Sequence, residues 1–336
     1  SAAELKEEIE KAIAAGLMDT NPMGDFDPTD MSDENYAKID LHRHIMDTVV
    51  LVSPSGKAMK RESDLIDVWF DSGSMPYAQW HYPFENKEKV EDGGAFPANF
   101  IAEGVDQTRG WFFTLHAISS MVFDSVAYKN VISNGLVLDK NGMKMSKRLG
   151  NAVDPFTTMD EYGADALRWY LLTNAAPWDN LRFDMEGLQE VRRKFFGTLH
   201  NTYAFFALYA NVDGFRYEEA DIPLHERPEM DQWILSELHS LIAKVEDGME
   251  AFEPTRAFRP IQEFTTEKLS NWYVRLGRRR FWKGAYEADK ISAYQTLWTC
   301  LETLSRLMAP LAPFYADQLY TDLHKGIAKT GETSVH

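Results

Sequence analysis

The sequence predicts an α/β domain followed by an all-α domain, and three observations support this prediction. Strand-like and helical segments alternate between about residues 99 and 173, which is typical of a mostly parallel sheet with crossover helices. After about residue 185 the strand pattern stops, and segments with helical periodicity follow one another. The chain is 44% hydrophobic and contains 20 Phe, 14 Tyr and 9 Trp, which is enough apolar surface for a substantial core.

The first 70 residues predict one helix and two strands. Apolar residues recur at helical spacing between Leu5 and Leu17, which predicts a short amphipathic helix. The polar stretch over 19–35 is rich in Asp, Asn, Pro and Gly and predicts a loop. Strands are predicted over 48–53 and over 64–70, the second running into a loop.

The middle of the chain carries the α/β pattern. A short strand is predicted over 99–102, and a helix over 106–123 follows it. Strand character returns over 130–138 and ends in a turn at 139–142. The next helix is predicted over 164–173.

The remaining residues predict a helical bundle. Helical periodicity covers the segments 186–212, 230–249, 254–277, 289–308 and 313–323. Pro254 and Pro313 stand where two of these helices would begin, a position that proline favours. We place the boundary between the two domains between about 175 and 190.

Composition excludes several classes of protein. No run approaches the roughly 18 uncharged apolar residues that a membrane helix needs, so no membrane partner is expected. Cys300 is the single cysteine, which excludes an internal disulfide or a multi-cysteine zinc site and suits a reducing cytoplasm. The net charge of −17 argues against indiscriminate binding to nucleic acid.

Two local basic patches stand against this acidic background. Residues 140–150 contain four basic side chains and no acidic one, and residues 268–283 contain six basic side chains and no acidic one. An acidic body with two basic patches can hold a polyanion in one defined pose, because the rest of the surface repels it.

The first patch contains the lysine loop, which we define as residues 144–148 (KMSKR). Two ammonium groups with a small hydroxyl residue between them form a mobile cationic clamp for the phosphates of a nucleotide. The alternative is a solvated basic loop. The preceding strand, the glycine-flanked turn and the following helix favour the nucleotide site.

The lysine loop resembles the KMSKS signature of the class I aminoacyl-tRNA synthetases. Further segments resemble the isoleucyl-tRNA synthetase family: 67–73 (DVWFDSG), 103–111 (EGVDQTRGW), 134–137 (NGLV), 231–236 (DQWILS) and 271–275 (NWYVR). The match runs in order over roughly residues 40–325. The valyl and leucyl relatives have different counterparts of the DVWFDSG segment, so isoleucine is the favoured amino acid.

This resemblance implies the second half of a Rossmann-type nucleotide-binding domain plus a helical anticodon-binding bundle. None of the nine histidines is followed by x-Gly-His, the motif that opens the family's catalytic fold. We therefore expect a fragment that lacks the N-terminal catalytic half and most of the editing domain, and that is catalytically incomplete alone. Its expected parts are a remnant of the editing insertion and its return segment (1–60), the C-terminal half of the catalytic domain with the KMSKR loop (61–185) and a helical tRNA-binding domain (186–336).

The resemblance also implies roles for individual residues. Lys144 and Lys147 are the expected catalytic residues. Contacts to ATP or the adenylate are expected from Glu103, Gly104, Asp106, Gln107, Met145, Ser146 and Lys147. Asp106 could instead cap the following helix. Trp69 and Trp111 are expected to form walls of the amino-acid pocket, although each could be a plain core residue.

The second basic patch predicts RNA binding. The expected tRNA-binding residues are Arg275, Arg278, Arg279, Arg280 and Lys283. They are interleaved with aromatic residues, and cations beside aromatics suit unpaired bases and their phosphates. The alternative is a solvated helix face over core aromatics, and helical spacing favours a core position for Trp272 and most of the other aromatics.

The resemblance thus implies ATP-dependent attachment of isoleucine to tRNA(Ile) through an isoleucyl-adenylate. Mg²⁺ would accompany ATP on its phosphate oxygens rather than occupy a dedicated protein site. The intact enzyme is expected to be a cytoplasmic monomer. Two alternatives remain open, a tRNA-binding module on a non-catalytic α/β scaffold and the closely related valyl-tRNA synthetase. A generic α/β protein with a coincidental lysine loop is a third, weaker one.

Overall fold

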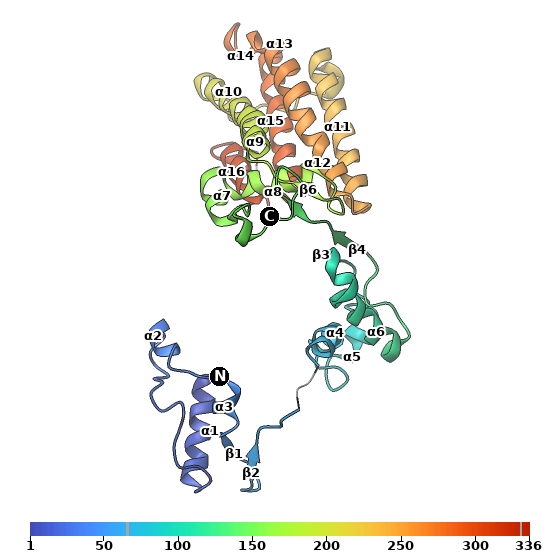
Figure 1. The fold of residues 1–336 in the computed structure, drawn as a ribbon. Coiled ribbons are helices and arrows are strands. Elements are labelled where there is room, and N and C mark those ends of the chain that lie inside the picture. The colour runs from blue at the N-terminus through green and yellow to red at the C-terminus, as the bar shows by residue number, and fades with distance from the viewer. Residues whose placement is uncertain (65–66, 330) are drawn as a thin grey trace. The chain divides into compact units, whose positions relative to one another are not determined.

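The computed structural model describes residues 1–64, 67–329 and 331–336, and for Lys147 the backbone alone. It divides into two units, Ser1–Ser72 and Gly73–His336, each of which is described by itself (Figure 1). No helix among the described residues combines the length and the apolar character needed to cross a membrane.

The N-terminal unit is built on the predicted helix and strand. Helix α1 (Ala2–Ala14) begins with a capping box in which the Ser1 hydroxyl accepts a hydrogen bond from the Glu4 amide at 3.3 Å. Its buried residue Ile9 packs with residues from the loop and strand that follow, forming a small core. Strand β1 (Val50–Val52) pairs antiparallel with β2 (Ala58–Lys60), a strand that the sequence did not predict. Two short helices lie between α1 and β1, namely α2 (Asp33–Tyr36) and α3 (Arg43–Met46).

The strand predicted over 64–70 is wrong, because helix α4 (Val68–Ala78) begins inside this segment and takes its last three residues. Leu65 and Ile66 lie outside the described residues. The carboxylate of Asp67 accepts hydrogen bonds from the backbone amides of Trp69 at 2.8 Å and Phe70 at 3.3 Å. A carboxylate that bonds the first free amides starts a helix, and this local signal outweighs the apolar run that resembled a strand.

The first part of the second unit contains one strand–helix–strand crossover. Strand β3 (Ile101–Gly104) pairs parallel with β4 (Val131–Asn134), and helix α6 (Trp111–Phe123) connects them after the short 3₁₀ turn η1 (Val105–Arg109). Helix α5 (Lys87–Glu91) precedes this crossover. Leu115 and Ile118 of α6 are buried, and they are two of the apolar residues whose helical spacing predicted this helix.

A second parallel pair joins the α/β part to the bundle. Strand β5 (Val137–Leu138) pairs with β6 (Leu181–Arg182), and η2 (Lys147–Leu149), α7 (Pro155–Tyr162) and α8 (Ala164–Asn174) lie between them in sequence. Gly135 permits this approach, because a Cβ atom there would lie 2.3 Å from the backbone oxygen of Asp179. Among the described residues every sheet is two-stranded. The single strand predicted over 130–138 is divided into β4 and β5, and β6 was not predicted.

The rest of the chain is the predicted helical bundle. Its elements are α9 (Met185–Glu190), the π-helix η3 (Val191–Phe196), α10 (Gly197–Asp213), η4 (Leu224–Glu226), α11 (Glu229–Glu250), α12 (Pro254–Glu263), the π-helix η5 (Phe264–Val274), α13 (Arg275–Gly277), α14 (Arg279–Trp282), α15 (Ala288–Met308) and α16 (Pro313–His324). Pro254 and Pro313 begin helices, as predicted. Helix α15 lies in the middle of the bundle (Figure 1), where Leu297, Leu301 and Leu304 are completely buried.

The core of the bundle extends into the preceding segment. Trp169 on α8 is completely buried and stacks on Phe195 with ring centroids 4.4 Å apart. Leu181 and Phe183 belong to the same core. The predicted domain boundary at residue 185 therefore stays a prediction. In the structure, α8 and β6 pack in the same core as the bundle.

Candidate functional site

The predicted adenylate residues lie where two parallel strands end together. Glu103 and Gly104 are the last residues of β3, and Gly104 is paired with Asn134 at the end of β4. Asp106 and Gln107 follow in η1, before the start of α6. The carboxyl ends of parallel strands, followed by a helix, are the place where α/β folds bind ligands.

Hydrogen bonds fix the backbone after β3. The Gln107 side-chain oxygen accepts from the amide of Trp111 at 2.9 Å, and its nitrogen donates to Asp106 at 3.2 Å. Gln107, rather than Asp106, therefore bonds the backbone at the start of α6. A Cβ at Gly104 would lie 2.5 Å from the Asp106 carboxylate, so this turn requires glycine unless that side chain moves. Glu103 and Asp106 are exposed.

The lysine loop begins at the end of a tight hairpin. The backbone at Leu138 forms an antiparallel bridge with Lys144, and the amide of Asp139 donates to the carbonyl of Met143 at 2.9 Å. The Asp139 carboxylate also accepts from the amides of Asn141 and Met143, at 2.9 and 2.8 Å. These bonds hold the first lysine of the loop at the end of a strand.

Asn151 closes the other side of the lysine loop, and the sequence reading did not single it out. Its amide nitrogen donates to Asp139 at 2.9 Å and to the carbonyl of Lys144 at 3.3 Å, while its oxygen accepts from the amide of Ser146 at 2.9 Å. The hydrogen bond from Asn151, with those from nearby backbone amides, holds the pKa of Asp139 below its ordinary value. One side chain thus ties the end of the loop to its beginning.

Replacing Asn151 with aspartate is expected to speed tryptic cleavage within the lysine loop by roughly tenfold. The change removes a donor and sets a second carboxylate against Asp139, a loss of about 1–2 kcal/mol. Limited trypsin digestion followed by mass spectrometry measures cleavage after the basic residues of the loop. The matched control is Asn141→Asp, which adds the same charge to the hairpin but removes none of the hydrogen bonds that the Asn151 side chain makes. Equal cleavage rates in both variants would contradict the role of Asn151.

The predicted catalytic and pocket residues have different environments in the structure. Lys144 is exposed, Met145 packs against the core of the bundle, and the side chain of Lys147 lies outside what the structure describes. Trp69 belongs to the N-terminal unit, whereas Trp111 belongs to the second unit. A shared cavity for these side chains therefore stays a prediction.

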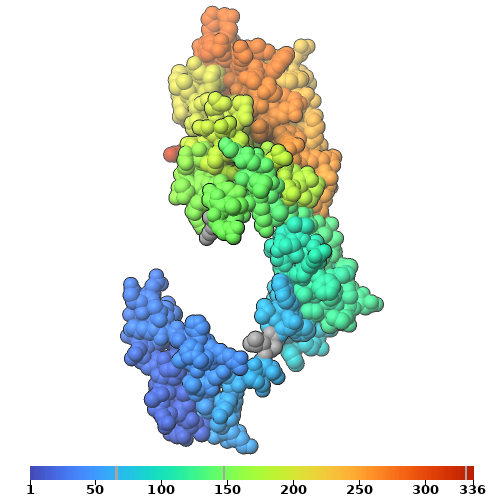
Figure 2. Space-filling view, in the orientation of Figure 1, coloured from blue at the N-terminus to red at the C-terminus, as the bar shows by residue number. Residues whose placement is uncertain are grey.

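Four of the five predicted tRNA-binding residues are exposed near one end of the bundle (Figures 1 and 2). We call Arg275, Arg278, Arg279 and Lys283 the basic face. The Arg278 guanidinium lies over the ring of Trp282, 5.5 Å from its centroid. Exposed arginines with an aromatic neighbour are free to meet a phosphate and a base.

Arg280 has a different environment. Its side chain is 17% exposed and forms a two-point ion pair with Asp231, at 2.6 and 2.8 Å. Burial disfavours the charge, but the hydrogen bonds and charge of Asp231 raise the pKa of Arg280 above its ordinary value. Asp289 pairs with the same guanidinium at 3.0 Å. We therefore leave Arg280 out of the basic face.

Asp231 is the centre of a buried polar cluster. It is completely buried, and it also accepts hydrogen bonds from the hydroxyls of Tyr273 at 2.7 Å and Ser292 at 2.5 Å. Burial, together with the negative charge of Asp231, raises the pKa of Tyr273 well above its ordinary value. The cluster joins α11, η5, α14 and α15.

The aromatic residues of this segment divide into two groups. Tyr273 and Phe281 are buried, as the sequence predicted for core residues. Trp272 and Trp282 are 57% and 45% exposed, so the core position favoured for Trp272 is wrong. Trp272 lies in η5, where π-helical winding takes more residues per turn than the α-helical period used to place it.

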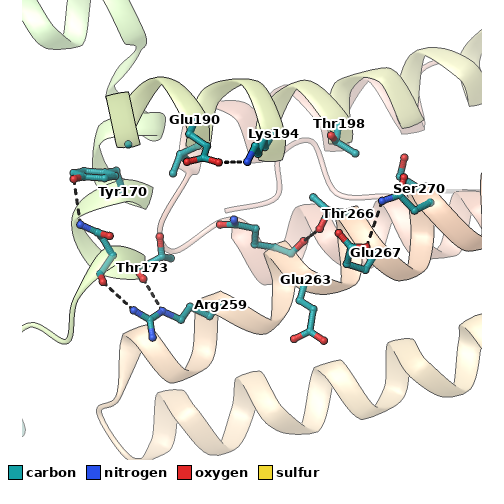
Figure 3. A pocket seen from close by; sticks show the side chains of 15 residues that line it. Tyr170, Thr173, Glu190, Lys194, Thr198, Arg259, Glu263, Thr266, Glu267 and Ser270 are labelled. Atoms are coloured by element: carbon teal, nitrogen blue, oxygen red, sulfur yellow. Dashed lines mark hydrogen bonds and ion pairs between the residues drawn. The ribbon is translucent and has the colours of Figure 1, made fainter. Parts of the chain in front are cut away.

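A polar cavity of about 750 Å³ lies elsewhere in the bundle (Figure 3). It lies between the α9–η3 segment and the α12–η5 segment, and the Glu190–Lys194 ion pair stands on one wall. On the other side Arg259 donates to the carbonyls of Thr173 at 2.6 Å and Asn174 at 2.9 Å. Among the described residues that line it, none is a predicted site residue.

Two family models match the sequence. Residues 21–184 match the model described as tRNA synthetases class I (I, L, M and V). Residues 231–336 match the model described as the anticodon-binding domain of tRNA ligase. The two matches correspond to the α/β part with its preceding segment and to most of the helical bundle.

Individual proteins agree with these models. The chain is 65% identical to the isoleucine–tRNA ligase of Bacteroides fragilis. The alignment covers the whole of this chain and 30% of that protein. It is 66% identical to the ligase of the same name from Porphyromonas gingivalis. That alignment covers 96% of this chain and 28% of that protein. The chain therefore spans about 30% of the length of such relatives.

A solved structure shows a similar fold. The crystal structure of the ternary complex of Agrobacterium radiobacter K84 agnB2 LeuRS with tRNA and LeuAMS superimposes with a TM-score of 0.61 and 21% sequence identity. The alignment covers 85% of this chain and 34% of that chain. Together with the family models, this likeness confirms the predicted α/β-then-helical fold class.

Proposed function

This chain belongs to the class I aminoacyl-tRNA synthetases of the isoleucyl type, and we propose that it serves the ATP-dependent attachment of isoleucine to tRNA(Ile). The observation that carries the proposal is the 65% identity to an isoleucine–tRNA ligase along the whole chain. The motif segments at residues 67–73, 103–111 and 144–148 lie within this match.

The proposed reaction has two steps. The carboxylate of isoleucine attacks the α-phosphate of ATP, which forms isoleucyl-adenylate and releases pyrophosphate. A terminal ribose hydroxyl of the tRNA then takes the isoleucyl group, and AMP leaves. Positioning and electrostatic stabilisation supply the catalysis, and neither step requires a nucleophilic side chain. Mg²⁺ would arrive on the phosphate oxygens of ATP and neutralise part of their charge.

We assign the lysine loop to the phosphates. Lys144 and Lys147 stabilise the negative charge that develops on the departing pyrophosphate, because ammonium groups on a loop can follow it. Met145 and Ser146 lie between them and border the nucleotide, with the Met145 side chain against the bundle core. The hydrogen bonds of Asn151 support this assignment, because they fix the start of the loop next to a parallel strand pair.

We assign the end of β3 to the adenylate. The exposed carboxylate of Glu103 accepts hydrogen bonds from the α-ammonium group or from a ribose hydroxyl. Gly104 lets the backbone approach the ligand, and Asp106 and Gln107 border it. Trp69 and Trp111 form the walls for the aliphatic side chain. Such walls separate isoleucine from valine by only about 1–3 kcal/mol, a limit for which isoleucyl enzymes are themselves the standard example.

We assign the basic face to the tRNA. Its four cations are exposed on one short segment of the bundle, which suits phosphates of the tRNA backbone. The overall charge of −17 disfavours other poses of the same polyanion. We also propose that the intact enzyme is a monomer in the cytoplasm.

Binding of a non-hydrolysable isoleucyl-adenylate analogue tests this function. We expect the chain to bind it weakly and more tightly than the valyl analogue. We expect Lys147→Ala to weaken binding of a non-hydrolysable ATP analogue, which keeps all three phosphates, by about tenfold, as for loss of a charged hydrogen bond. Calorimetry measures the affinities, and Lys140→Ala is the matched control in the same hairpin. An ATP analogue that binds equally well to both variants would remove the clamp assignment. A chain that binds tRNA(Ile) but no analogue would favour the non-catalytic scaffold.

A further inference from the structure

A groove with two tryptophan walls lies between α11 and η5, apart from the predicted active site. It has a volume of about 630 Å³ and is lined by Glu229, Met230, Trp233, Glu267, Lys268 and Trp272. The ring centroids of Trp233 and Trp272 are 6.2 Å apart, and the rings are inclined by 51°. Trp272 is 57% exposed, which leaves much of a large indole surface open to solvent. Exposed aromatic surface beside a groove is typical of a binding site.

The charges at the groove favour a neutral group with hydrogen-bond donors. Lys268 forms an ion pair with Glu237, so its charge is compensated. Glu229 and Glu267 also line the groove, and Glu267 accepts a hydrogen bond from the Asn271 side chain at 3.4 Å. Their negative charges would repel a phosphate placed there. The same carboxylates can accept hydrogen bonds from the amino groups at the edge of a nucleobase.

Cations for the flanking phosphates stand on the same segment of chain. Arg275 directly follows Val274, the last residue of η5, and Arg278 and Arg279 come three and four residues later. All three are exposed. Stacking aromatics with arginines beside them is the pattern by which proteins hold unpaired nucleotides.

The buried cluster around Asp231 connects the two segments that carry the tryptophan walls. Asp231 precedes Trp233 by two residues on α11, and Tyr273 directly follows Trp272 in η5. The Tyr273 hydroxyl donates to Asp231 at 2.7 Å, so one hydrogen bond joins the two backbones that carry the walls. A groove fixed in this way loses little conformational entropy when it is filled.

We propose that the Trp233–Trp272 groove holds one unpaired nucleobase of the bound tRNA, stacked on the indoles with its amino edge toward Glu229 and Glu267. This inference rests on the proposed function and names a contact within it. The arginines of the basic face bind the phosphates on either side of that base.

The test measures binding of a tRNA(Ile) transcript to the full chain by fluorescence anisotropy. We expect Trp272→Leu to weaken binding by about 5- to 100-fold, as for loss of one stacked base. Trp272→Phe, which keeps a ring, is expected to restore part of the affinity. The slope of log affinity against log salt should stay unchanged, because no phosphate contact is lost. Trp178→Leu, at another half-exposed tryptophan, is the matched control.

A second measurement uses tryptophan fluorescence with two RNA probes. A hairpin with an unpaired loop is expected to quench the wild-type emission, and a blunt RNA duplex with no unpaired base is not. Trp272→Leu should reduce the quenching. Circular dichroism melting confirms that each variant is folded.

The outcomes separate this inference from the proposed function. If Trp272→Leu binds tRNA as tightly as the wild type while loss of the basic face weakens binding, the groove proposal is wrong and tRNA binding stands. If the wild type binds no tRNA, both proposals fail. If an arginine-rich peptide quenches the tryptophans and the RNA hairpin does not, the groove binds a cationic peptide, and the nucleobase assignment is overturned.

Discussion

Replacing Asp231 with alanine is expected to destabilise the helical bundle by about 3–5 kcal/mol, the usual cost of removing one partner of a buried ion pair. The change leaves Arg280 charged in a largely buried position, where its two-point bond at 2.6 and 2.8 Å is lost. The hydroxyls of Tyr273 and Ser292 also lose their acceptor inside the core. A buried donor without an acceptor adds to the cost because its desolvation is no longer compensated.

Urea denaturation followed by circular dichroism measures this effect as a change in the free energy of unfolding. The matched control is Asp289→Ala, which removes the other carboxylate from the same guanidinium. Asp289 is 61% exposed, so its ion pair is screened by solvent and the expected loss is at most about 1 kcal/mol. Equal losses in the two variants would show that burial of Asp231 does not set the strength of the cluster.

Removing three arginines of the basic face together is expected to lower the affinity for tRNA(Ile) by about 50-fold at 0.15 M salt. The variant is Arg275→Gln/Arg278→Gln/Arg279→Gln. Each phosphate contact on a single strand contributes about 0.7 to the slope of log affinity against log salt. With about five phosphates contacted, the wild type should show a slope of roughly −3 to −4, and the variant should lose about 2 of it.

Anisotropy titrations between about 0.05 and 0.2 M salt measure both quantities. The matched control, Lys57→Gln/Lys60→Gln/Lys87→Gln, removes the same charge from exposed positions outside the basic face. A wild-type affinity that does not change with salt would contradict the basic face. An equal loss in the control would mean that overall charge, rather than this segment, attracts the tRNA.

Local signals in the sequence were sufficient for most of the secondary structure. Prolines at helix starts and apolar residues at helical spacing located the long helices, because these patterns act within a few residues. The strand predicted at 64–70 failed because the cap made by Asp67 outweighed the apolar run. Trp272 was misplaced because a π-helix shifts the angular position of each side chain, and nothing in the sequence marked that winding.

The candidate site was predictable to the same extent. The lysine loop and the segment from Glu103 to Trp111 were recognisable because short motifs preserve both residue type and spacing. Asn151 was missed, although it directly follows Gly150 just after the loop, because its role depends on bonds to residues five to twelve positions away. The separation of Arg280 from the other arginines depends on Asp231, 49 residues earlier.

The sequence by itself determined the order of the α/β and helical parts, the lysine loop and the membership of the synthetase family, because each is recorded in local periodicity or in a motif. Only the tertiary structure decided which charged side chains face solvent and which form ion pairs inside the bundle. Six basic residues between 268 and 283 look alike in the sequence. Burial beside Asp231 makes one of them, Arg280, a structural ion pair, whereas solvent exposure leaves Arg275, Arg278 and Arg279 available to a polyanion. The physical reason is that the cost of burying a charge depends on what long-range folding places next to it.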